Sequence, residues 1–112
     1  MKLFLNQKYI PIVEAIHFQE RLQGLIGKKQ IDFGMLFPKC NAIHTFFMQE
    51  AIDVIGLNEQ KEIIFIERNV TPNKIIKIHH PIKKTSILEL PKNTSFTLKI
   101  GEKLFFEFED IV

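Results

Sequence analysis

Residues 40–48 read Cys-Asn-Ala-Ile-His-Thr-Phe-Phe-Met, and residues 52–55 follow with Ile-Asp-Val-Ile. Apolar side chains occur at consecutive positions here, without a regular alternation with polar ones. Such runs predict strands that are buried on both faces, as in a closed barrel or in a sheet covered on both sides. The few polar groups inside the stretch need hydrogen-bond partners, because an unpaired polar group is costly to bury. They are therefore the first candidates for a functional site.

Short strand-like runs separated by turn residues continue this pattern along the chain. The clearest is Lys103–Glu109, where large apolar residues occupy every second position, as in a strand with one buried face. Ile63–Ile66 is apolar throughout, which again indicates burial on both faces. We therefore expect a mainly β (α+β) domain that forms a small closed or partly closed barrel. The expected strands are Lys2–Leu5, Ile10–His17, Gly34–Phe37, Ile43–Met48, Asp53–Asn58, Glu62–Asn69, Lys74–His79, Ser86–Leu90 and Lys103–Glu109.

One helix is expected near the N-terminus, over Phe18–Ile26, because an apolar stripe recurs there at helical spacing. Gly27 follows it and suits the left-handed conformation that commonly ends a helix. Arg21 falls at the edge of the stripe, so its stem can lie on the core while its guanidinium reaches a carboxylate or solvent. The stripe consists of Phe18, Leu22, Leu25 and Ile26.

The composition indicates a single domain over residues 1–112. Hydrophobic residues make up 46% of the chain and charged residues 25%, as in folded globular proteins. A chain of 112 residues supports one core and is too short for two. Cys40 is the single cysteine, which excludes an intrachain disulfide, and no apolar stretch approaches the length of a membrane span. Polar residues interrupt the N-terminus before a signal peptide's apolar region is complete. We expect a cytoplasmic, soluble domain with no membrane partner.

The charge balance disfavours nucleic acid as the partner. The formal net charge is only +2, and Arg21 and Arg68 are the only arginines among 15 basic residues. Lysine is a weak choice for bidentate recognition of phosphates or base edges. A weak single-stranded RNA-binding barrel stays one hypothesis, supported by small size, β content and lysine alone. It predicts binding that falls steeply with salt.

His44 and Asp53 are the candidate catalytic residues. A lone imidazole on a strand can act as an acid or a base, although such a histidine is more often a core residue bonded to a backbone group or a carboxylate. Asp53 is its natural partner, and the two together would form an oriented base. Alternatively, Asp53 bonds turn amides at the entry to its strand, which we consider the better interpretation.

Cys40 precedes His44 by four residues, which raises the question of a thiol–imidazole pair. In an extended chain that separation spans roughly 13 Å, so activation of the thiol would require the chain to turn back. We therefore favour a buried, inert thiol. No metal or other cofactor is expected, because neither Cys40 and His44 nor the adjacent pair His79 and His80 form a recognised ligand pattern.

Several motifs occur in a fixed order with this stretch: Arg21–Lys28, Gly34–Phe37, Cys40 with Ile43–Met48, Ile52–Ile55 and Leu88–Pro91. Together they resemble the motifs of an uncharacterised family called domain of unknown function 192. The resemblance covers most of the chain. It implies a compact, mainly β domain with a helix near the N-terminus, and it implies no reaction.

The chain departs from the pattern of similar sequences at two informative positions. Gly56 stands where a bulky phenylalanine is usual, and a glycine in a strand indicates a bulge or a close backbone approach. Asn93 stands where glycine is usual after Pro91. Asparagine is the best replacement for glycine in a left-handed turn, so we expect the backbone geometry to be kept.

Two hypotheses compete with RNA binding. The leading one is a small non-enzymatic domain, monomeric or weakly dimeric, that binds a small molecule or a protein partner at a shallow cleft. An exposed apolar patch around Phe46, Phe47 and Met48 would support it. The second is an enzyme of unknown class that uses His44 and Asp53. In either case the candidate ligand-binding residues are Arg21, His44, Thr45, Asp53 and Glu89, with Arg21 and Glu89 also able to bridge helix and barrel as an ion pair.

Overall fold

The computed structural model describes residues 1–15 and 31–108. The helix predicted over Phe18–Ile26, and Arg21 within it, lie outside these residues. The described elements are strands β1 (Lys2–Leu5), β2 (Lys8–Glu14), β3 (Gly34–Phe37), β4 (Ala42–His44), β5 (Ile52–Leu57), β6 (Ile63–Val70), β7 (Ile75–Lys77), β8 (Ser86–Pro91) and β9 (Phe106–Glu107), with one 3-10 helix, η1 (Ile82–Lys84). No helix in the described part is long and apolar enough to cross a membrane.

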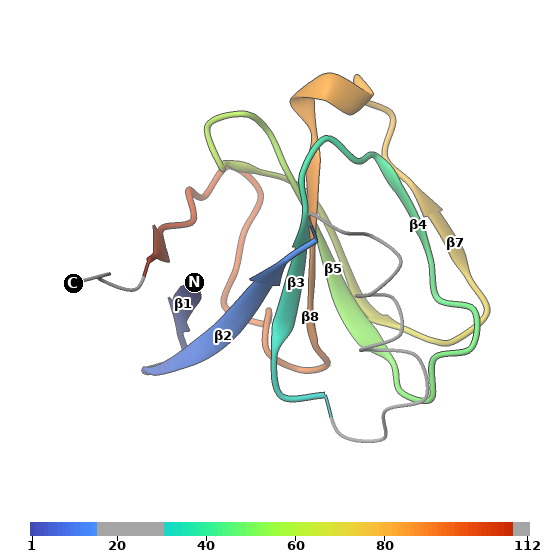
Figure 1. Cartoon of the computed structure of the whole chain (residues 1–112), viewed down its shortest axis with the longest axis horizontal. Helices are drawn as coiled ribbons and strands as arrows, with labels where there is room; N and C mark the ends of the chain where they lie inside the picture. Colours follow the sequence, from blue (N-terminus) through green and yellow to red (C-terminus); the bar gives the residue numbers. More distant parts are fainter. Residues whose placement is uncertain (16–30, 109–112) are drawn as a thin grey trace.

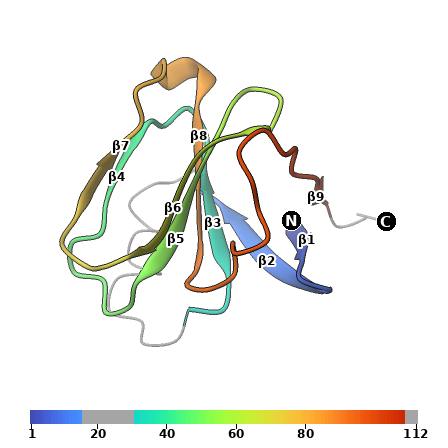
Figure 2. The ribbon, with the colours of Figure 1, turned by 180° about the vertical axis from the view of Figure 1, so that it is seen from behind.

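Seven strands form one mixed sheet in the order β6-β5-β8-β3-β2-β1-β9, and β4 pairs with β7 in a separate two-stranded sheet. The β2–β3 pair is parallel, and the other described pairs are antiparallel. Figure 1 shows β4 and β7 side by side, on the opposite side of the molecule from β1, and Figure 2 shows the same arrangement from behind. The mainly β expectation is confirmed.

A closed barrel is not found in the described strands. Strands β6 and β9 are the two edges of the large sheet, and they do not pair with each other. An isolated bridge between Glu62 and Lys103 brings the two ends of the sheet together at one point. Within the described residues, the strand predicted over Lys103–Glu109 is reduced to Phe106–Glu107, because the chain changes its pairing partner here. The Leu104 amide donates to the Lys61 carbonyl, whereas Phe106 pairs with Leu3 of β1.

The core lies on both faces of the large sheet, which explains the uninterrupted apolar runs in the sequence. Along β5, Val54 belongs to one buried cluster and Ile55 to the other, because successive side chains of a strand point to opposite faces. The Val54 cluster includes Ile76 of β7 and Ile78 just after it. The small β4–β7 sheet therefore covers the face of the large sheet that carries Val54.

Both informative departures in the sequence have a structural reason. A side chain at Gly56 would place its Cβ 2.5 Å from Cδ1 of Ile78 and 2.9 Å from Cβ of Phe65, and the register between β5 and β6 shifts at this point. The glycine thus permits the close approach and the bulge that the sequence indicated. Asn93 has a φ of 64°, which confirms the expected left-handed turn after β8.

The predicted strand Ile43–Met48 ends early, at His44. The chain turns from Thr45 to Met48, with a hydrogen bond from the Met48 amide to the Thr45 carbonyl and a left-handed φ of 66° at Phe47. The turn separates the side chains of the expected apolar patch. Phe46 is 36% exposed and Phe47 76% exposed, whereas Met48 is buried in the core.

Candidate functional site

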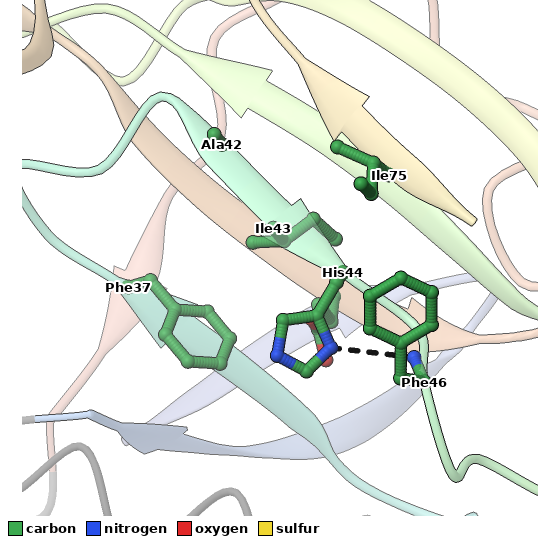
Figure 3. Close-up of a pocket in the computed structure, with 7 residues that line it drawn as sticks. Phe37, Ala42, Ile43, His44, Phe46 and Ile75 are labelled. Atoms are coloured by element: carbon green, nitrogen blue, oxygen red, sulfur yellow. Dashed lines mark hydrogen bonds between the residues drawn. The ribbon is translucent and has the colours of Figure 1, made fainter. Parts of the chain in front are cut away.

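A half-open pocket of about 250 Å³ lies where β4 meets the large sheet. Figure 3 shows the His44 ring in the pocket with the rings of Phe37 and Phe46 around it. Apolar groups supply most of the wall, and Glu89 of β8 contributes a carboxyl group. The described lining residues are Phe37, Ala42, Ile43, His44, Phe46, Ile75 and Glu89.

Glu89 is the most unusual polar group of this pocket. Its neighbours on the adjoining strands are Met35 and Val54, so the sheet places a carboxyl group between two apolar side chains. Glu89 is only 4% exposed, and within the described residues no hydrogen bond or ion pair reaches its carboxyl oxygens. Burial raises the pKa of Glu89 to about 8, because the charged form is poorly solvated. The group is therefore mostly protonated and uncharged at neutral pH in the ligand-free protein.

His44 lies at the end of β4 and is exposed to solvent. Its Nδ1 accepts a hydrogen bond from the Phe46 amide (3.3 Å), and the two rings stack with centroids 4.9 Å apart. A nitrogen that accepts carries no proton, so the neutral ring has its proton on Nε2. The turn at residues 45–48 thus fixes both the orientation and the tautomer of this imidazole.

Asp53 lies on the opposite face of the sheet from Glu89. It pairs with Leu90, the residue after Glu89, and successive residues of a strand point to opposite faces. Its buried carboxylate accepts from the Asn69 amide (2.9 Å), the Ser95 amide (3.1 Å) and the Ser95 hydroxyl (2.6 Å). The structure therefore does not bring Asp53 to His44. Instead, Asp53 bonds backbone amides, as in the alternative interpretation. Asn69 lies at the bulge between β5 and β6, and Ser95 lies in the segment after β8.

Thr45 is fully buried and its hydroxyl is used within the fold. The hydroxyl donates to the Thr71 carbonyl (2.8 Å) and accepts from the Lys74 amide (2.9 Å). These bonds join the end of β4 to the turn before β7, and they hold the segment that carries His44. Thr45 does not line the pocket.

Cys40 lies half-buried just before β4 and donates from Sγ to the Ala42 carbonyl (3.1 Å). Burial raises the pKa of this thiol, and the hydrogen bond to Ala42 opposes the rise. The negative charge that Glu89 carries above about pH 8 raises the pKa further. A raised pKa keeps the thiolate, which is the nucleophilic form of cysteine, scarce at neutral pH. Within residues 1–15 and 31–108, no group of three aspartate, glutamate, cysteine or histidine side chains is arranged so that it could hold a metal ion.

Of the residues proposed from the sequence, His44 and Glu89 share one pocket, Thr45 and Asp53 are bonded elsewhere, and Arg21 lies outside the described residues. Sequence reasoning did not anticipate the lining by Phe37, Ala42, Ile43 and Ile75, which come from three strands. No local pattern marks them, because the pocket exists only where these strands meet. The signal for Glu89 was present in the sequence as a charged residue within an otherwise apolar strand.

A family model matches residues 3–106 of the chain. The chain belongs to the DUF192 family. That family is described as "Uncharacterized ACR", so membership brings no reaction with it.

Two solved structures share this DUF192 fold. A protein of unknown function from Novosphingobium aromaticivorans superimposes with a TM-score of 0.69 at 15% identity, over 94% of this chain and 82% of the other. A protein from Sinorhizobium meliloti, described as "a putative transcription regulator", superimposes with a TM-score of 0.74 at 23% identity, over 93% and 89% of the two chains. No curated protein matches the chain. At such identities the likeness establishes the fold alone.

Proposed function

We propose that this DUF192 domain binds a small, mainly apolar molecule in the pocket beside β4, with Glu89 as the polar anchor. The observation that carries the proposal is the carboxyl group of Glu89, buried without a partner in the described residues at the wall of a pocket that opens to solvent. A buried polar group left unsatisfied costs roughly 1–3 kcal/mol. An apolar side chain between Met35 and Val54 would avoid that cost, and no described residue offsets it by bonding the carboxyl group of Glu89.

The size and lining of the pocket support a small ligand. Its volume of about 250 Å³ falls below the roughly 300–1,000 Å³ that is typical of pockets for drug-sized molecules. Phe37, Ile43 and Ile75 offer apolar contact, and Glu89 and His44 offer the few polar groups that would orient a ligand. This combination is the usual composition of a binding site.

The arrangement supports binding without catalysis. Of the two candidate catalytic residues only His44 lines the pocket, and the carboxylate of Asp53 is already bonded to Asn69 and Ser95. The thiol of Cys40 is uncharged and hydrogen-bonded to the chain. None of these groups forms the linked nucleophile and base that covalent catalysis requires.

A second hollow, of about 400 Å³, is larger but has weaker support. It lies between the start of the chain and the segment before β9, and its lining includes exposed residues such as Lys103, Phe105 and Phe108. No buried polar group without a partner lines it among the described residues. Volume alone is a poor sign of a site, so we assign the function to the Glu89 pocket.

Nuclear magnetic resonance of the isotope-labelled chain tests the proposal. A library of small apolar fragments is titrated while the backbone amides of Ala42, Ile43 and Phe46 are followed. We expect saturable shifts confined to these amides, and Glu89→Leu should abolish or change the set of fragments that bind. Glu107→Gln, at an exposed glutamate on β9, is the matched control and should bind as the parent does. The proposal fails if no fragment shifts the pocket amides in the folded parent protein.

A further inference from the structure

Three aromatic rings and one carboxyl group line the pocket together. Phe37 of β3, His44 of β4 and Phe46 of the following turn contribute the rings, and Glu89 contributes the acid. The faces of phenylalanine rings carry partial negative charge and attract cations. A carboxylate does the same with a full charge. Both kinds of group in this lining therefore favour a positively charged ligand.

The remaining described lining offers an anion no lysine or arginine side chain. Among the described lining residues there is no lysine or arginine, and the backbone amide of Phe46 donates to Nδ1 of His44, which keeps that nitrogen unprotonated. Within the described residues, a ligand carboxylate or phosphate would face Glu89 without a lysine or arginine to compensate its charge. Complementary potentials select partners of opposite sign, so the pocket discriminates against anions.

The scarcity of hydrogen-bond acceptors narrows the kind of cation. A primary ammonium has three N–H donors and needs three acceptors when it is buried. Among the described lining side chains, only the Glu89 carboxylate is placed as a buried acceptor, and Ala42, Ile43 and Ile75 are apolar. Methyl groups on the nitrogen replace N–H donors and contact such walls favourably, while the positive charge remains. Aromatic pockets that hold quaternary ammonium ions work in this way.

We infer that the pocket recognises a methylated ammonium group on a free small molecule, held by the carboxylate of Glu89 and the rings of Phe37 and Phe46. This inference rests on the proposed function and specifies its ligand class. The small volume of the pocket suits a compact head with two or three N-methyl groups. Binding of the cation requires Glu89 to release its proton, so the measurement is made at a pH above 8.

Four compounds with the same hydroxyethyl chain test the inference: ethanolamine, N,N-dimethylethanolamine, choline and 3,3-dimethylbutan-1-ol. The last is the uncharged analogue of choline, with carbon in place of nitrogen. At pH 8.5 the amides of Ala42, Ile43 and Phe46 report the dissociation constant of each. We expect choline or the dimethyl amine to bind at least tenfold more tightly than both ethanolamine and the uncharged analogue.

Two pairs of variants assign the effect to the pocket. Glu89→Gln should weaken choline binding at least tenfold and leave the uncharged analogue unchanged, whereas Glu107→Gln should change neither. Phe46→Leu should weaken choline at least threefold, whereas Phe47→Leu, at the exposed neighbour outside the pocket, should not. If the uncharged analogue binds as tightly as choline, the inference is wrong and the proposed function stands. If neither these compounds nor the apolar fragments shift the pocket amides, both fail.

Discussion

Replacing Glu89 with glutamine should remove a pH-dependent loss of stability. The ordinary pKa of the group is 4.5, and burial in the folded protein raises it to about 8. As the pH rises above 4.5, the unfolded chain loses this proton while the folded chain keeps it, so unfolding becomes easier. The contribution of protonated Glu89 to stability is fully present below pH 4.5. It falls as the pH rises to about 8 and changes no further above that value.

The magnitude follows from the shift of the pKa. Each unit is worth about 1.4 kcal/mol, so Glu89 lowers the free energy of unfolding by about 5 kcal/mol between pH 4.5 and 8. At pH 7 the loss is about 3 kcal/mol. Glutamine has nearly the same shape and no proton to lose. Glu89→Gln should therefore gain stability relative to the parent by about 1.4 kcal/mol per pH unit across this range.

Urea denaturation of both proteins at half-unit steps from pH 5 to 9 measures the effect. The difference between the two free energies of unfolding isolates Glu89, because all other groups are common to both chains. The titratable groups that face Glu89 in the described structure are the imidazole of His44 and the thiol of Cys40, while Glu67, beyond β5, is exposed. Stability curves that stay parallel from pH 5 to 8 would refute the reasoning. The reasoning would also be refuted if the free energy of unfolding of the parent rose relative to that of the variant with increasing pH. That result is expected if Glu89 forms an ion pair with Arg21.

Three further predictions concern the residues around the site. Asp53→Asn should destabilise the fold by about 2–4 kcal/mol, because Asn69 and Ser95 donate hydrogen bonds to a charged acceptor. Fragment binding at the pocket should persist. Equal stability of variant and parent in urea would contradict this prediction. Gly56→Ala should cost about 1–3 kcal/mol, because the new Cβ would lie 2.9 Å from Cβ of Phe65, which cannot move without its backbone, and 2.5 Å from Cδ1 of Ile78. An unchanged thermal midpoint would contradict this packing. Cys40 should react with iodoacetamide at neutral pH more slowly than a free cysteine, because burial raises its pKa, and a rate equal to that of free cysteine would show that the thiol is not protected.

The turn chemistry of this chain was accessible from the sequence because it depends on neighbours along the chain. Asn93 takes the left-handed conformation expected of it, and Gly56 marks a bulge and a close approach, although the partner Ile78 was not foreseen. The early end of β4 was missed. It follows from hydrogen bonds of Thr45 to Thr71 and Lys74, which lie more than 25 residues away, and no local propensity encodes such bonds.

The sequence by itself determined a mainly β domain of the DUF192 family with strands buried on both faces. Tertiary structure decided how that burial is achieved, since a barrel and a covered open sheet require the same uninterrupted apolar strands. It also decided the partners of the polar residues. Asp53 and Glu89 lie on adjacent strands in similar apolar runs, but Asp53 pairs with Leu90 and not with Glu89. The two side chains therefore point to opposite faces of the sheet, Asp53 towards backbone amides and Glu89 towards the pocket. The alternation of side chains between the two faces of a strand follows from local backbone geometry. Which face carries a pocket depends on the elements that pack over it, here the β4–β7 sheet.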